Sequence, residues 1–410
     1  MVCILLSFCW HSRADISELG REYNNKTSMM KPSYYFDYNA TTPLDNDVSD
    51  EMVKVLKAEH GNPSSVHHIG QRARFLLDDY RDRVSKIWQC KPSEIVFTSG
   101  GTESNNLALV GTARLLRQKG KHIVTSKIEH HAVLHTLEYL EKYEGYSITR
   151  VDVSPDGFVD PEDVSRAIKS DTVLVSIIAA NNEIGTIQPI REIGKVCRDK
   201  EVLFHTDAVQ WFGKEPVENI SIFNADLVSV CGHKFHGPKG SGALYIKSPL
   251  LPHPIIFGGG HENERRAGTE NLPNIAGLTY AIENFTVHPV FQRKNILEWK
   301  EKIAEEINNH PGVTCRSPME NCLSNTLSFT VKESDGMMLI ANFDLEGVCV
   351  SSGSACSAGS IEPSHVIEAL GATKEESSAL VRISMGRENT EDEIQHLLNC
   401  LPKIIQISKD

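Results

Sequence analysis

The chain has 410 residues, enough for a large hydrophobic core and for more than one domain. Its apolar fraction of 40% and charged fraction of 23% are those of a globular protein. The formal net charge of -12 argues against unaided binding to nucleic acid or to a membrane, so we expect small molecules and proteins as partners.

The ten cysteines are scattered without a CxxC pair, so neither a zinc knuckle nor a disulfide framework is indicated. This pattern fits a reducing compartment, and we expect the cytoplasm rather than an organelle such as the mitochondrion. No apolar run approaches the roughly 20 residues that span a bilayer.

Residues 1–30 are expected to form an N-terminal tail. Val2 to Trp10 is apolar, but no basic residue precedes it and acidic residues follow it. Neither a secretory signal nor a mitochondrial presequence fits this composition. Met29 or Met30 is an alternative start, which leaves open whether the first 28 residues belong to the mature protein.

Residues 45–285 are expected to form a large α/β domain, because apolar runs alternate with helical patterns. Helices are predicted from Glu103 to Lys119, capped by Gly120, and from Pro161 to Lys169. The predicted strands are Ile95–Phe97, Ile123–Val124, Val173–Ile178, Leu203–Phe204, Leu227–Val230 and Ala243–Ile246.

Residues 31–44 and 286–410 are expected to form a smaller α+β domain. The glycines at 258–260 are read as a loop near the boundary. Short strands are predicted at Leu327–Val331, Val348–Val350 and Leu380–Ser384, and helices at Phe291–Asn309, Glu333–Asn342, Pro363–Leu370 and Glu391–Leu401.

Three segments of the large domain carry residues suited to binding a phosphorylated pyridine. Thr98 to Asn105 joins a strand to a helix, where backbone amides could hold a phosphate, although a plain turn explains the pattern equally well. Asp207 follows a strand and could pair with a ring nitrogen, or simply cap a helix. Lys234, between His233 and nearby glycines, could hold an aldehyde, or be one more surface lysine.

Eight motifs in one order make the chain resemble the class V aminotransferase-fold cysteine desulfurases, the NifS/IscS-like family. The resemblance runs from about Tyr35 to the C-terminus and implies a fold type I, pyridoxal-phosphate-dependent enzyme. The motifs are Asp37–Pro43, Gly61–Ser64, Thr98–Ser104, Glu129–Val133, Asn181–Gly185, His205–Gln210, Gly232–Lys234 and Arg265–Glu270.

The resemblance assigns each matching residue a role. Lys234 would hold the cofactor aldehyde, Asp207 would pair with the pyridine nitrogen, and His130 would stack on the ring and assist proton transfer. Arg382 would clamp the substrate carboxylate. The remaining expected contacts are Gln210 and Asn182 at the phenolic side of the ring, and Gly101, Thr102 and His233 at the phosphate.

Two further positions concern the phosphate. In the family a threonine at the position of Thr269 reaches the phosphate of the neighbouring subunit, which implies a homodimer. The position of Cys231 is usually a serine that helps to hold the phosphate. Because a thiol is a weaker donor, we expect slightly looser cofactor binding than in a Cys231→Ser variant.

Cys356 is the expected nucleophile. It lies among serine, alanine and glycine, so we expect an exposed and mobile loop, whereas Cys349 reads as a buried, unreactive strand residue. The sequence around Cys356 resembles that of the long-loop, IscS-type branch of the family. A loop cysteine without that resemblance would more often be incidental than catalytic.

No resident metal site is expected. His131 and His135 lie one helical turn apart and His130 is adjacent, but no third ligand follows at a suitable spacing. His67 and His68 are also read as structural. Cys356 could transiently bind an iron–sulfur cluster as cargo.

The resemblance therefore implies conversion of L-cysteine to L-alanine, with the sulfur passing as a persulfide on Cys356 to an iron–sulfur scaffold or another sulfur carrier. The identity of that acceptor is left open. Two alternatives remain: a selenocysteine lyase on the same fold, and an inactive assembly scaffold.

Overall fold

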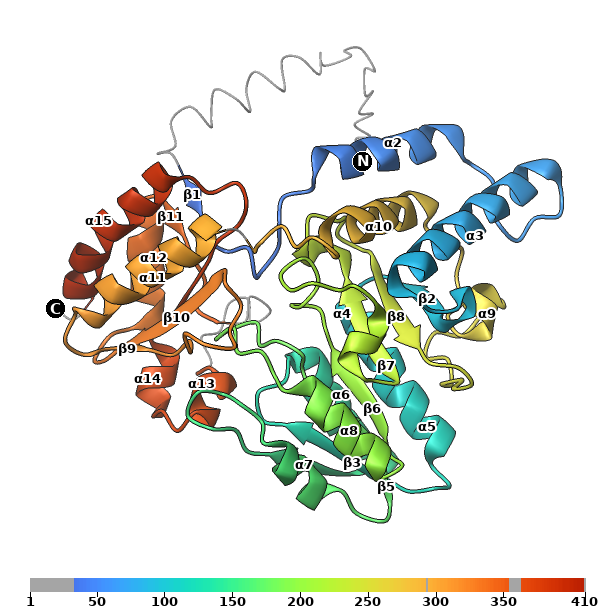
Figure 1. Cartoon of the computed structure of the whole chain (residues 1–410), viewed down its shortest axis with the longest axis horizontal. Helices are drawn as coiled ribbons and strands as arrows, with labels where there is room; N and C mark the ends of the chain where they lie inside the picture. The colour runs from blue at the N-terminus through green and yellow to red at the C-terminus, as the bar shows by residue number, and fades with distance from the viewer. Residues whose placement is uncertain (1–32, 293, 354–362, 409–410) are drawn as a thin grey trace, which may run out of the picture.

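The computed structural model describes residues 33–292, 294–353 and 363–408. Figure 1 shows two lobes of unequal size, with the blue segment after β1 (Tyr34–Tyr35) passing from the smaller lobe to the larger one. In the described parts of the chain, no helix combines the length and the apolar character that crossing a membrane requires.

The larger lobe is built on a seven-stranded sheet of order β2-β8-β7-β6-β5-β3-β4. β8 runs antiparallel to both neighbours and the other pairings are parallel, so the sheet is mostly parallel and the predicted α/β fold is confirmed. The strands are β2 (Ile95–Thr98), β3 (His122–Ser126), β4 (Ser147–Val151), β5 (Thr172–Ser176), β6 (Leu203–Asp207), β7 (Leu227–Cys231) and β8 (Gly242–Ile246).

Helices cover both faces of this sheet because successive strand residues point to opposite sides. Ile95 and Phe97 join one apolar core, and Val96 joins the other. The first face packs α2 (Asn46–Ala58), α3 (His68–Trp88), α7 (Pro161–Ala167), α8 (Ile190–Asp199) and α10 (Leu272–Phe285). The second packs α5 (Thr112–Leu116), α6 (His131–Glu144) and the π-helical turn η2 (Leu107–Gly111), which follows α4 (Gly101–Asn106).

The predicted helix from Glu103 to Lys119 is wrong at both ends. Helical structure runs from Gly101 to Leu116, and both Lys119 and Gly120 donate backbone hydrogen bonds to the Leu116 carbonyl after the helix has ended. Gly120 does not cap the helix but permits a close approach, since a β-carbon there would lie 2.1 Å from the Asp171 oxygen. The edge strand β4 was not predicted, because its alternating residues are only half-buried.

Short helices complete the larger lobe. They are η1 (Pro92–Glu94), η3 (Ile220–Phe223), η4 (Gly232–Lys234) and α9 (His261–Glu264). The glycines at 258–260 form a loop before α9, as predicted.

The smaller lobe contains an antiparallel sheet of order β12-β10-β9. Leu327 and Phe329 of β10 face an apolar core that also takes in Phe36. The elements are β9 (Val313–Cys315), β10 (Thr326–Val331), β11 (Val348–Cys349), β12 (Leu380–Ser384), α11 (Lys294–Asn308), α12 (Gly336–Leu345), α13 (His365–Ala369), α14 (Lys374–Ser378) and α15 (Glu391–Ile407).

Two predictions in this lobe need correction. The helix expected from Glu333 begins at Gly336, because the Asp335 side chain accepts the Met338 N–H at 3.0 Å and caps it there. Cys349 lies in a strand, as predicted, but it is only half-buried. That strand, β11, pairs with β1 and so ties the N-terminal segment to the smaller lobe.

Candidate active site

One cavity gathers ten of the twelve predicted site residues. Arg382 comes from the smaller lobe, Asn39 and Ala40 come from the connecting segment, and the other lining residues come from the larger lobe. The lining residues are Asn39, Ala40, Gly101, Thr102, Asn105, His130, Ile178, Asn182, Asp207, Val209, Gln210, Cys231, His233, Lys234 and Arg382.

The sheet places the cavity at the carboxyl ends of its strands. Asp207 ends β6 and Cys231 ends β7, and these two strands are parallel neighbours. Open α/β sheets bind ligands at this edge. The position of the acid, the thiol and the lysine that follows them is therefore a consequence of the topology.

Lys234 ends η4, directly after β7. Its Nζ donates hydrogen bonds to the backbone oxygens of Asn39 at 2.8 Å and Ala40 at 2.7 Å. These carbonyls were not predicted as site groups, because a backbone acceptor leaves no trace in the residue type. They hold the amine inside the cavity rather than at the surface.

Asp207 is buried, and its carboxylate is held by two neutral donors. Asn105 Nδ2 donates to Oδ2 at 2.6 Å, and the Val209 N–H donates to Oδ1 at 3.0 Å. Burial raises the pKa of Asp207, and these donors and the Lys234 charge oppose the rise. Asn105 was missed, although it lies one helical turn after Thr102 and so shares a helix face with it.

Gln210 connects the cavity to a buried lysine. Its Nε2 donates to the Asn39 oxygen at 2.9 Å, and its Oε1 accepts a hydrogen bond from Lys214 Nζ. Burial lowers the pKa of Lys214 well below its usual range, with the Lys234 charge as a further cause. Because its acceptor oxygen is engaged by Lys214, Gln210 is set to act as a donor. Lys214 was not predicted.

His130 is the N-cap of α6. Its Nδ1 accepts the Ala132 N–H at 3.1 Å, so the proton of the neutral ring is on Nε2. Burial, followed by the nearby Lys234 charge, lowers the pKa of His130 to about 4. The ring is neutral at pH 7 and offers Nε2–H as a hydrogen-bond donor.

Gly101, Thr102, Cys231 and His233 line a hollow next to the cavity, at the start of the helical segment that begins with α4. A β-carbon on Gly101 would lie 2.6 Å from Val209 Cγ2, so only glycine allows the backbone at 101 to pack this closely against Val209. The free backbone N–H groups of a helix start favour an anion. Burial raises the pKa of the Cys231 thiol, which keeps it protonated and able to donate weakly.

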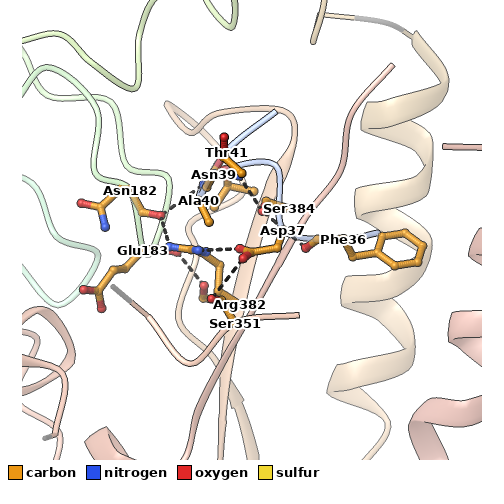
Figure 2. Close-up of polar contacts among 12 residues, drawn as sticks. Phe36, Asp37, Asn39, Ala40, Thr41, Asn182, Glu183, Ser351, Arg382 and Ser384 are labelled. Atoms are coloured by element: carbon orange, nitrogen blue, oxygen red, sulfur yellow. Dashed lines mark hydrogen bonds and ion pairs between the residues drawn. The ribbon is translucent and has the colours of Figure 1, made fainter. Parts of the chain in front are cut away.

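Arg382 belongs to β12 and lines the cavity. Figure 2 shows its guanidinium group between Asp37 and Asn182. Its Nη2 donates to Asp37 Oδ1 at 2.7 Å, and its Nη1 donates to the backbone oxygen of Asn182 at 3.0 Å. Its buried Nε has no hydrogen-bond partner among the described residues. A buried cation with an unused N–H can bind a carboxylate. Asp37 was not predicted as a site residue.

The donor set fits pyridoxal phosphate. The buried Asp207 carboxylate accepts hydrogen bonds from two neutral donors. A protonated ring nitrogen of the cofactor would add a positive charge, which would stabilise the ionised carboxylate against the cost of burial. The hollow at the start of this helical segment suits a phosphate, and Lys234 supplies the amine for an aldehyde.

Thr269 lies outside this cavity, in a second hollow lined by Ser99, Gly240 and Asn274 among others. Ser99 and Gly240 also line the hollow that contains Gly101, Thr102, Cys231 and His233, so the two hollows are neighbours, although Thr269 itself lines neither that hollow nor the main cavity. Cys356 falls in the segment 354–362, outside the described residues, so its predicted exposure and its role as the nucleophile are not tested.

The predicted structural histidines have neighbours of their own. His67 caps α3 by accepting the Gly70 N–H at 3.3 Å. The His131 ring lies 4.8 Å from the rings of both His135 and His365, measured between centroids. No group of three or more ligating side chains able to hold a metal ion occurs within the described residues.

Comparisons with known proteins give one family. The model of the family described as aminotransferase class-V matches residues 34–397. The cysteine desulfurase IscS of Dictyoglomus turgidum is 44% identical over 378 residues, which cover 92% of this chain and 95% of that protein. The protein of the same name from Methanosarcina thermophila is 41% identical over 372 residues, or 91% of this chain and 92% of that one.

Solved structures give the same result. A structure named NifS-like protein superposes with a TM-score of 0.83 at 36% identity, covering 92% of this chain and 99% of that chain. A structure titled SspA in complex with cysteine superposes with a TM-score of 0.76 at 36% identity, covering 87% of this chain and 99% of that one.

Proposed function

The chain belongs to the class-V aminotransferase family, and on that premise we propose that it is a cysteine desulfurase that converts L-cysteine to L-alanine. The observation that carries the proposal is the convergence of Lys234, Asp207 and Arg382 on one cavity. They supply an amine, a buried acid and a carboxylate clamp, which are the groups that an amino-acid substrate and a pyridoxal cofactor need.

Pyridoxal phosphate would be held by Lys234 at its aldehyde, by Asp207 at its ring nitrogen and by the hollow of Gly101, Thr102, Cys231 and His233 at its phosphate. When bound, it withdraws electrons from the amino acid joined to it. Gln210, whose oxygen is held by Lys214 and one of whose N–H groups donates to the Asn39 backbone oxygen, would offer its other N–H to the phenolic side, and Asn182 lines the same cavity.

The protein side chains then handle protons and orientation. Lys234 is the amine in the cavity that can take and return a proton at the substrate carbon. His130 would offer its Nε2–H to the cofactor ring. It acts as a donor rather than as a base, because its Nδ1 already accepts the Ala132 N–H and its pKa of about 4 makes the neutral imidazole a weak proton acceptor at pH 7. Arg382 binds the substrate carboxylate and fixes which bond faces Lys234.

The sulfur step needs a thiolate, and Cys356 is its proposed source. The thiolate attacks the substrate sulfur, so that an S–S bond forms as the Cβ–S bond breaks. The electron pair of the broken bond stays with the carbon fragment, which takes up a proton and leaves as L-alanine. The sulfur remains on Cys356 as a persulfide, for delivery to an iron–sulfur scaffold or another sulfur carrier.

The proposal includes a homodimer and the cytoplasm. A dimer is supported by the position of Thr269, which leaves it available to a neighbouring cavity. The cytoplasm is supported by the cysteines, of which all seven in the described residues are free thiols.

The test compares Cys356→Ser with Lys234→Ala. The serine variant should keep the yellow absorbance of the bound cofactor yet release no sulfide from L-cysteine, whereas the alanine variant should lose both properties. Desulfuration by Cys356→Ser at the parent rate would refute the mechanism. Parallel assays with L-selenocysteine address the lyase alternative, because selenium leaves without a cysteine nucleophile.

A further inference from the structure

The Asp37 carboxylate joins two groups that belong to different parts of the smaller lobe (Figure 2). Its Oδ1 accepts a hydrogen bond from Arg382 Nη2 at 2.7 Å, and its Oδ2 accepts one from Ser351 Oγ at 3.3 Å. Arg382 is 1% exposed and the Asp37 side chain 17% exposed, so solvent screens this ion pair only weakly. Nothing in the proposed chemistry uses Asp37 directly.

Asp37 itself is fixed by backbone pairing. Phe36 donates its N–H to the Cys349 oxygen at 2.9 Å, and Ser384 donates its N–H to the Phe36 oxygen at 2.7 Å. Ser351 and Arg382 also exchange two backbone hydrogen bonds, at 3.2 and 2.7 Å. The carboxylate thus projects from a rigid junction of strands and can orient a long side chain.

The Arg382 guanidinium is held at two nitrogens and left unpaired at the third. Nη2 meets Asp37, Nη1 meets the Asn182 oxygen, and Nε is buried with no partner in the described part of the chain. An arginine side chain has several rotatable bonds, so a planar contact with a ligand requires that its orientation be fixed beforehand. Among the residues that the structure describes, Asp37 is the acidic side chain that forms an ion pair with Arg382 and so fixes this orientation.

We propose that Asp37 is a positioning residue for substrate recognition: it holds the Arg382 guanidinium so that its remaining donors face the carboxylate of the amino acid in the cavity. The inference rests on the proposed function, because it assigns the carboxylate to an amino-acid substrate. It makes Asp37 a determinant of the preference for α-amino acids over simple amines.

Two ligands that contain no sulfur, and so cannot be desulfurated, isolate this effect. L-alanine and ethylamine both carry an amine that can react with the bound cofactor, but only L-alanine carries a carboxylate. Their dissociation constants can be read from the change in cofactor absorbance, without turnover. The ratio of the two constants measures carboxylate recognition and cancels effects on the cofactor or on the fold.

Asp37→Asn removes the charge and keeps the shape. The dissociation constant for L-alanine should rise about tenfold, which corresponds to about 1.4 kcal/mol, while that for ethylamine should change less than twofold. Glu283→Gln is the matched control, because it removes the charged partner of Arg83, which Glu283 holds through contacts of 2.8 and 2.6 Å between α3 and α10. It should change neither constant.

Ser351→Ala provides a milder variant if Asp37→Asn does not fold. It removes only the 3.3 Å contact to Oδ2, and it should raise the L-alanine constant about two- to fourfold with no change for ethylamine. Equal losses for both ligands, or an unchanged ratio in both variants, would overturn the role of Asp37 and leave the proposed function intact. A parent protein that binds neither ligand would refute the proposed function itself.

Discussion

Burial sets the protonation of the titratable side chains around the cavity. It lowers the pKa values of His130 and His233 to about 4 and raises that of Glu129 to about 8. At pH 7 these three groups are neutral. These three side chains therefore add no charge to the cavity. The electrostatic field from Asp207 and Arg382 is not offset by them.

The protonation of Glu129 can be tested through the pH dependence of the free energy of unfolding. Its Oε1 accepts hydrogen bonds from Ser126 Oγ at 2.5 Å and the Ile178 N–H at 2.9 Å, and its Oε2 has no partner in the described residues. Between pH 4.5 and 8 the folded protein holds a proton on Glu129 that the unfolded chain has lost. Stability from this group should therefore fall as pH rises, by up to about 1.4 kcal/mol per pH unit.

Glu129→Gln removes the titration and keeps the shape. Relative to this variant, the parent should lose stability steadily from pH 5 to pH 8 and then level off. Denaturation midpoints of both proteins at pH 5, 6.5, 8 and 9 provide the measurement. Curves that run parallel over this range would mean that Glu129 is ionised in the folded protein.

Cys231 offers a second test at the residue scale. The thiol lies in the hollow assigned to the phosphate, next to Gly101 and His233, and a serine hydroxyl at this place would be a stronger donor. Cys231→Ser should bind pyridoxal phosphate slightly more tightly, about two- to fivefold in the dissociation constant, as measured by fluorescence or absorbance titration. Equal constants would show that the residue at 231 does not contribute to holding the phosphate.

At the scale of elements, the sequence predicted the strands of the large sheet because their residues are apolar on both faces. β5 and β7 are buried throughout, and most of their residues are apolar. The edge strand β4 is half-buried, mixes polar and apolar residues, and was missed. Boundaries failed where a tertiary contact decides them, as at Gly120, whose packing against Asp171 has no local signature.

The same distinction holds for the site. Lys234, Asp207 and Arg382, which line the cavity, could be predicted because they sit in recognisable motifs. Asn105, Asp37 and Lys214 were not found, since each acts through another side chain, and such pairings depend on contacts between distant segments. Backbone acceptors such as the Ala40 oxygen cannot be read from any residue type.

At the scale of the whole molecule, the connecting segment makes the two lobes interdependent. The Asn39 side-chain amide donates to the backbone oxygen of Asn182 in the larger lobe and to Thr326 Oγ1 in the smaller lobe. The backbone oxygen of Asn39 accepts hydrogen bonds from Lys234 and Gln210. One residue thus touches the lysine, the glutamine and both lobes. A shift of the lobes would move Arg382 relative to Lys234, so substrate binding and lobe packing are coupled.

Thr269 does not line the cavity of its own chain. In a dimer, the question is therefore whether Thr269 contributes to the active site of the neighbouring subunit. If Thr269 serves the cavity of a neighbour, a mixture of Lys234→Ala and Thr269→Ala subunits should form hybrid dimers with one defective and one intact site. After co-refolding or co-expression, activity should rise to about one quarter of the parent value, because about half of the dimers are hybrids and each has one working site.

Two controls belong to this measurement. Each variant alone should have far less activity than the mixture, and light scattering should show a dimer for all three samples. If Thr269 served its own chain, every site in a hybrid would carry one of the two defects, and mixing would restore nothing. An absence of complementation in proven hybrids would therefore place Thr269 outside the neighbouring site and remove the structural reason for sharing active sites between subunits.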